Sequence, residues 1–189
     1  MTLLLRLSDR DMAKAAQAGA FRSQLARASG VGNQKIDLNR SDSDIDIDGI
    51  KSEMAVAKVF ELEYDPFHFG VDTGVDLWSG DISIDVKSTR HDNGHLIFKN
   101  TDAFKSHVAI LCVVKGITVR VCGGIERVSF KKNHKRIKFN SNYPSCPAVT
   151  QEELQPVEDM WRLMIKSKFA REGTGLYDYK SFPFVDKKG

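Results

Sequence analysis

The sequence has few of the features that define secreted or membrane proteins. Only 3 of its 189 residues are cysteine, an odd number without the spacing of metal ligands. No apolar run approaches the length of a membrane span, and residues 1–11 turn polar too quickly for a signal peptide. We therefore expect a cytosolic protein without a membrane partner, in which the thiols of Cys112 and Cys122 are buried.

Neither sign of charge dominates the chain. Its 28 lysines and arginines face 25 acidic residues, for a net charge of +3. This balance does not require a nucleic-acid partner, but the charges are unevenly distributed. Residues 42–48, DSDIDID, are acidic, and we interpret them as a solvated loop that precedes a helix with Asp48 as its N-cap.

The basic counterpart is FKKNHKRIKF, residues 130–139. We predict a hairpin that turns near Asn133 and His134 and contacts a DNA backbone through salt-dependent, sequence-independent attraction. A solvated basic turn is the alternative. The proposed DNA-binding residues, which include one arginine from an earlier strand, are Arg90, Lys131, Lys132, Lys135, Arg136 and Lys138.

The length fits one compact domain with a substantial core. We divide it into residues 1–48 with a helix and the acidic loop, residues 49–148 as the core with the basic hairpin, and residues 149–189 with a last helix and a tail. The fold class expected is α/β, a mixed central β-sheet flanked by helices, with helical additions at both ends.

Several segments have clear periodicity. Residues 10–28 predict an Ala-rich helix that ends at Gly30, whose arginines and lysine lie on DNA or on a partner subunit. The apolar run 108–114 predicts a buried central strand, and residues 117–123 and 126–130 extend the sheet. Thr150 and Glu153 form a capping box for the last helix. Its expected packing face is Val157, Met160, Trp161 and Met164.

The segment VDLWSGDISIDVK, residues 75–87, keeps charged residues within a strand pattern. Its second half alternates, so Asp85 and Lys87 share one face of a strand. A turn at Ser79–Gly80 would pair Leu77 with Ile82 and place Asp76 diagonal to Asp85, at roughly 7–8 Å between backbones. Two carboxylates so placed can share one cation. The plain alternative is a hairpin with one solvated polar face.

A helix over residues 49–63 precedes this hairpin. Its apolar stripe of Ile50, Met54, Ala57 and Phe60 includes Glu53, and a carboxylate buried there needs a partner or a metal. Glu53 at the edge of the stripe, pointing to water, is the alternative.

The order of Glu53, GVD ending at Asp76, and DVK from Asp85 to Lys87 resembles the PD-(D/E)XK nuclease superfamily, which has the restriction-endonuclease-like fold. The resemblance spans roughly residues 49–115, with Val75 where the family often has proline. Within that superfamily the chain is most similar to small phage-encoded proteins of unassigned role, which would place it in the cytoplasm of a host cell.

The resemblance implies a helix before a small mixed sheet, with the acidic residues on adjacent central strands. Asp76 and Asp85 would bind Mg²⁺ or Mn²⁺, and the Val86 carbonyl and Glu53 would complete the shell directly or through water. Lys87 would orient or help to deprotonate the attacking water and stabilise the developing negative charge.

The activity implied is a metal-dependent deoxyribonuclease. We prefer an endonuclease because the sequence shows no helicase or ring-forming module, and a homodimer is compatible with cutting two strands. The main alternative is a catalytically inactive DNA- or protein-binding module of the same fold, such as a phage factor that acts on a host enzyme. An unrelated α/β protein with a chance D-x-K pattern is the third possibility.

Overall fold

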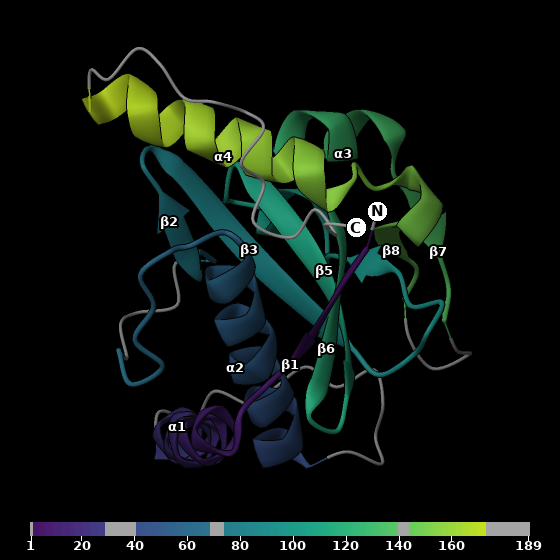
Figure 1. The fold of residues 1–189 in the computed structure, drawn as a ribbon. Helices are drawn as coiled ribbons and strands as arrows, with labels where there is room; N and C mark the ends of the chain where they lie inside the picture. Colours follow the sequence, from purple (N-terminus) through teal and green to yellow (C-terminus); the bar gives the residue numbers. More distant parts are fainter. Residues whose placement is uncertain (1, 29–40, 69–73, 140–143, 173–189) are drawn as a thin grey trace, which may run out of the picture.

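A five-stranded mixed sheet forms the centre of the molecule (Figure 1). The computed structural model describes residues 2–28, 41–68, 74–139 and 144–172. The strands follow the order β1-β6-β5-β3-β2, in which β3 and β5 are parallel and all other neighbours are antiparallel. They are β1 (Leu3–Arg6), β2 (Leu77–Ser79), β3 (Ile82–Thr89), β5 (Val108–Lys115) and β6 (Thr118–Glu126). The predicted mixed α/β architecture is confirmed, with β5 as the central strand.

Helices α2 (Asp42–Val59) and α4 (Val157–Glu172) cover one face of this sheet. Their apolar side chains share a core with alternate residues of β3 and β5, among them Ile84, Val86 and Ile110. Helix α1 (Asp9–Ala28) packs mainly against α2 (Figure 1). The N-terminal helix is therefore confirmed, while its expected end at Gly30 lies outside the described residues.

The opposite face of the sheet is covered by a second, smaller layer. This layer holds a three-stranded sheet in the order β4-β8-β7 and the helix α3 (Arg127–Asn133). The remaining elements are β4 (Leu96–Ile97), β7 (Lys135–Ile137), β8 (Cys146–Val149) and the 3-10 turns η1 (Thr101–Ala103) and η2 (Gln151–Glu153). Its core joins Phe98, Phe104 and Phe130 to the other set of β5 residues, among them Ala109 and Leu111.

The prediction of a basic hairpin at residues 130–139 is wrong. Residues 127–133, which include most of the strand expected at 126–130, form helix α3, and only Lys135–Ile137 enters a strand. The reason is tertiary packing, because Phe130 is fully buried and lies edge-on to the rings of Phe98 at 5.1 Å and Phe104 at 5.4 Å. A helix buries this ring while it keeps the neighbouring lysines in solvent.

The predicted acidic loop is also wrong. Residues 42–48 form the first two turns of α2, whose N-cap is Ser41 and not Asp48. The Ser41 hydroxyl accepts a hydrogen bond from the Asp44 amide at 3.0 Å, and the acidic first turn suits the positive end of the helix dipole. The expected boundary between residues 48 and 49 therefore falls inside α2, and Asp48 itself is buried.

The hairpin between β2 and β3 forms with a register two residues away from the predicted one. Leu77 pairs with Ile84 and Ser79 with Ile82, so the loop is Gly80–Asp81. Gly80 has a φ of 57°, a left-handed conformation that glycine adopts without steric cost. Because the shift is even, each side chain stays on its predicted face.

The C-terminal helix buries the face that its sequence predicts, and Val157, Met160, Trp161 and Met164 are at most 1% exposed. The predicted capping box of Thr150 and Glu153 is present, but it closes η2 and not the start of α4. All three cysteines are free and buried, as predicted for Cys112 and Cys122. Within the described ranges, no helix is long and apolar enough to cross a membrane.

Candidate active site

Asp85 and Lys87 lie on the same side of β3, and they form an ion pair. The Lys87 Nζ is 2.7 Å from the Asp85 Oδ1 and 5.1 Å from the centre of the Phe98 ring. Asp85 is only 2% exposed, so the alternative of a solvated polar face is wrong at this position. The Lys87 side chain is 38% exposed. Its ammonium is thus held between a carboxylate and an aromatic ring while it still reaches solvent.

Asp76 lies at the start of β2, beside Asp85. Its amide donates to the Ile84 carbonyl at 2.8 Å, and its Oδ2 accepts a hydrogen bond from the Val86 amide at 2.6 Å. The surrounding protein and the charges of Glu53 and Asp85 raise the pKa of Asp76. Asp76 is exposed to solvent, which limits the size of this rise but not its direction. A nearby cation would favour the ionised form.

Glu53 lies on α2 and is 4% exposed, so it does not point to water. Arg22 of α1 binds it with two parallel hydrogen bonds, Nη1 to Oε1 at 2.9 Å and Nη2 to Oε2 at 3.1 Å. The Tyr64 hydroxyl donates to Oε2 at 2.6 Å. Burial alone would lower the pKa of Arg22. The hydrogen bonds and the charge of Glu53 together have the larger effect, so the pKa of Arg22 is raised. Burial and the Glu53 carboxylate raise the pKa of Tyr64, which remains a neutral donor.

The sheet separates Glu53 from Asp85. Alternate residues of a strand point to opposite faces, and Ile84 and Val86 face the core that includes α2. Asp85 therefore points to the other face, together with its β5 partner Ala109 in the second core. Asp76, at the edge of the sheet, is the residue whose pKa responds to both carboxylates.

The predicted single shell of three carboxylates is not formed in this arrangement. Within the part of the chain that the structure describes, no group of three or more Asp, Glu, His or Cys side chains is placed to hold a metal ion. Mg²⁺ nevertheless needs only one or two protein carboxylates, since it retains several waters. Asp76 and Asp85, on neighbouring strands, have the hard oxygen donors that Mg²⁺ and Mn²⁺ prefer. Their chemistry fits such an ion, whereas both Glu53 oxygens already accept hydrogen bonds from Arg22 or Tyr64.

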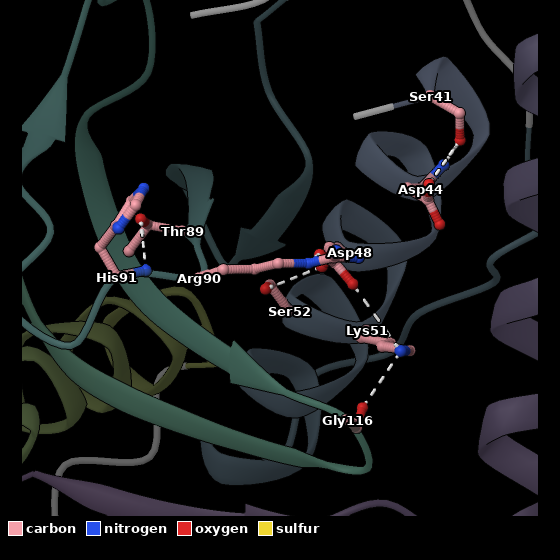
Figure 2. Close-up of polar contacts among 9 residues, drawn as sticks. All are labelled: Ser41, Asp44, Asp48, Lys51, Ser52, Thr89, Arg90, His91 and Gly116. Carbon is pink, nitrogen blue, oxygen red and sulfur yellow. Dashed lines mark hydrogen bonds and ion pairs between the residues drawn. The ribbon is translucent and has the colours of Figure 1, made fainter. Parts of the chain in front are cut away.

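Arg90, predicted to contact DNA, is bound to α2 (Figure 2). Its Nε donates to the Asp48 Oδ2 at 2.6 Å, and the Lys51 Nζ lies 3.7 Å from the other oxygen of the same carboxylate. Lys51 also donates to the Gly116 carbonyl at 3.1 Å, in the turn between β5 and β6. Arg90 therefore joins the end of β3 to α2, although its side chain is 47% exposed.

The other predicted DNA contacts are exposed residues on and next to α3 and β7, here called the basic surface. Lys131 lies 3.8 Å from Asp102, and Lys135 lies 3.0 Å from Glu153. Such exposed ion pairs contribute little stability and exchange readily for other anions. The surface lies over the second core, on the same side of the main sheet as Lys87. Its members, all exposed, are Lys131, Lys132, Lys135, Arg136 and Lys138.

Sequence reasoning did not identify three residues of this site. Arg22 was included only in a general expectation that the α1 arginines bind DNA or a partner, and its pairing with Glu53 joins residues 31 positions apart. Tyr64 follows α2 and gave no signal. Phe98 fits an ordinary apolar strand pattern, and nothing in that pattern indicates a lysine above its ring.

No curated protein matches this chain, and no solved structure does. One protein family matches residues 2–101, which is more than half of the chain and includes Arg22, Glu53, Asp76, Asp85 and Lys87. No function is known for that family. The chain belongs to the family of unknown function DUF5843.

Proposed function

We propose that this protein is a metal-dependent deoxyribonuclease with a restriction-endonuclease-like fold, and that it acts as an endonuclease. One observation carries the proposal: Lys87 is ion-paired with the buried Asp85 at 2.7 Å, and Asp76 lies beside them on the neighbouring strand. Two acidic residues and a lysine so placed could hold a divalent ion and position a water for metal-dependent phosphodiester hydrolysis. The mixed sheet with a preceding helix agrees with the same reading.

The proposed roles follow from the surroundings of each side chain. Asp76 and Asp85 would hold Mg²⁺ or Mn²⁺, with the Val86 carbonyl as a further ligand; when bound, the ion lowers the pKa of its water and polarises the phosphate. Lys87 reaches solvent from a fixed position above Phe98. It would orient the attacking water and stabilise the negative charge that develops on the phosphate.

The basic surface over α3 and β7 would supply most of the affinity for DNA. Its lysines lie on the Lys87 side of the sheet, so one duplex could contact both. Affinity of this type depends on released counterions and falls steeply with salt. A homodimer would bring a second site to the opposite strand. The cytoplasm of a host cell, the location expected for a phage-encoded member, keeps the three buried thiols reduced.

A catalytically inactive DNA- or protein-binding module of the same fold is the second candidate. It is favoured by the absence, among the described residues, of a group of three acidic, histidine or cysteine ligands. Each site carboxylate also has a protein partner, which is Lys87 for Asp85, Arg22 for Glu53 and the Val86 amide for Asp76.

Incubation with a panel of DNA substrates tests the proposal. Wild type, Asp85→Ala and Lys87→Ala would each be mixed with supercoiled, linear, single-stranded and four-way-junction DNA in Mg²⁺, Mn²⁺ or EDTA. We expect cleavage that needs the metal and is lost in both variants. Wild-type protein that binds DNA without cutting it under any of these conditions would favour the inactive module.

A further inference from the structure

Helix α1 lies outside the region that resembles a nuclease, yet it reaches the candidate site. Its Gly19 makes this possible, because a Cβ at that position would lie 2.6 Å from the Ile47 Cγ1 and 2.8 Å from the Ile47 nitrogen. Only glycine permits the two helices to approach so closely. Arg22 lies one turn after Gly19, so the same contact sets the position of its guanidinium against α2.

Helix α2 supplies the carboxylate that binds that guanidinium. Gly49 lies one turn before Glu53, and a Cβ there would be 3.9 Å from the Arg22 Nη1 and 3.7 Å from the Glu53 Oε1. The Arg22–Glu53 pair therefore lies within van der Waals contact of the Cβ position at Gly49. Tyr64 adds its hydroxyl from the segment after α2, so three elements of the chain combine to fix one arginine.

Glu53 is poorly placed to be a metal ligand in this chain. Both of its oxygens accept hydrogen bonds from Arg22, and one also accepts from Tyr64. It lies on the α2 side of the sheet, whereas Asp85 points to the other side. A bidentate carboxylate of this kind is suited to orient a guanidinium.

Arg22 has donors to spare. A guanidinium has five N–H groups, and the two parallel bonds to Glu53 use two of them. Its side chain is 36% exposed although it is engaged in this ion pair. The charge of Asp76 acts on Arg22, and the charges of Glu53, Asp85 and Lys87 act on Asp76, so both cations lie near that aspartate. The planar guanidinium of Arg22 therefore has N–H donors that could bind a phosphate group.

We propose that Arg22 binds a backbone phosphate of the DNA at this site, and that Glu53 and Tyr64 are positioning residues that hold it there. The inference rests on the proposed function, since it names a substrate contact of the same site. Arg22 and Lys87 would both contact the backbone near Asp76, and α1 would be part of the active site.

The salt dependence of DNA binding tests this contact without any need for cleavage. The variants would be made in the Lys87→Ala background and titrated with a fluorescent duplex in Mg²⁺ at several salt concentrations. Each phosphate contact contributes about 0.9 to the slope of log K against log salt. We expect Arg22→Ala to reduce the slope by about that amount. Arg162→Ala is the matched control, because Arg162 is an exposed arginine paired with Asp159 on α4.

A second variant covers the case in which Arg22→Ala fails to fold. The double variant Arg22→Gln with Glu53→Gln removes both charges together and leaves two amides that can hydrogen-bond to each other. We expect it to show the same reduced slope and to bind Mn²⁺ in calorimetry as tightly as wild type does. A double variant that loses Mn²⁺ as completely as Asp85→Ala does would make Glu53 a metal ligand and overturn the positioning role.

The two proposals fail in different ways. Wild-type cleavage together with equal salt slopes for Arg22→Ala and Arg162→Ala would overturn the Arg22 contact and leave the nuclease intact. A wild type that binds DNA but never cuts it would remove the nuclease, while the slope would still decide whether Arg22 contacts phosphate. Failure to bind any duplex would overturn both proposals.

Discussion

Two acidic residues of α2, Asp48 and Glu53, invite comparison because their immediate surroundings are similar. They are 2% and 4% exposed, and each binds an arginine from another element, Arg90 at the end of β3 and Arg22 on α1. In both cases a carboxylate buried on a helix is compensated by a guanidinium that remains partly in solvent. The helix is therefore tied to the rest of the fold at two points.

The wider surroundings separate the two regions. Asp48 has two cationic partners, Arg90 and Lys51 (Figure 2). Around Glu53 the balance is reversed, since Asp76 and Asp85 add two further acids to the cations Arg22 and Lys87. One region holds the fold together, and the other has an excess of negative charge that a bound cation would relieve. The excess marks the candidate site.

The largest effect is expected for Lys87→Ala. If Lys87 acts on the reacting phosphate, its loss should lower the rate of DNA cleavage by about 100-fold or more, the usual scale for one such group. The control is Lys115→Ala, which breaks a comparable lysine–aspartate pair on the surface, with Asp92 at 3.2 Å. A gel-based rate assay compares the two. Equal rates for these two variants would remove Lys87 from the mechanism.

A change at Asp48 should affect stability and not metal binding. Asp48→Ala leaves the buried Lys51 without its carboxylate, and we expect a loss of about 3 kcal/mol in the free energy of unfolding, the lower end for breaking a buried pair. Urea denaturation measures it. Asp44→Ala, which removes an exposed acid bonded to Ser41 on the same helix, should cost about 1 kcal/mol or less. Equal losses in the free energy of unfolding for Asp48→Ala and Asp44→Ala would show that the buried Asp48 pair does not stabilise the fold.

The smallest effect on stability is expected for Asp11 of α1, which, like Asp48, is a buried acid paired with a cation from another element. Burial opposes its ionisation, but hydrogen bonds from Lys58 and Ser8 outweigh it and lower the pKa to about 2. The folded pKa lies below the unfolded value, so Asp11 contributes stability above about pH 4 that is lost as the pH falls toward 2. Unfolding measured across this range should show a shallower dependence on pH for Asp11→Asn. Parallel curves for the two proteins would contradict it.

Local patterns allowed much of the fold to be predicted. The helix at α1, the apolar run of β5 and the packing face of α4 follow from periodicity over long segments, where burial and local preference agree. The pairing of Asp85 with Lys87 on one strand face also follows from alternation alone. These features need no knowledge of distant residues.

The errors arose where a tertiary contact or a small energetic difference decides. Phe130 enters a core built by Phe98 and Phe104, which are more than twenty residues away, and this makes α3 a helix. The alternating acidic run resembled a loop, since its buried members find their partners elsewhere, as Asp48 does in Arg90. The register of the hairpin depended on one turn residue. Arg22 and Glu53 meet only because two helices pack, which no local pattern reveals.

Calorimetric titration of Mn²⁺ into wild type, Asp85→Ala and Lys87→Ala tests most directly whether the acidic excess is a metal site. We predict that wild type binds the ion and that Asp85→Ala does not. Lys87→Ala should bind at least as tightly as wild type, because it removes a cation that competes for Asp85 at 2.7 Å. No binding by wild type, or an equal loss in both variants, would contradict the account.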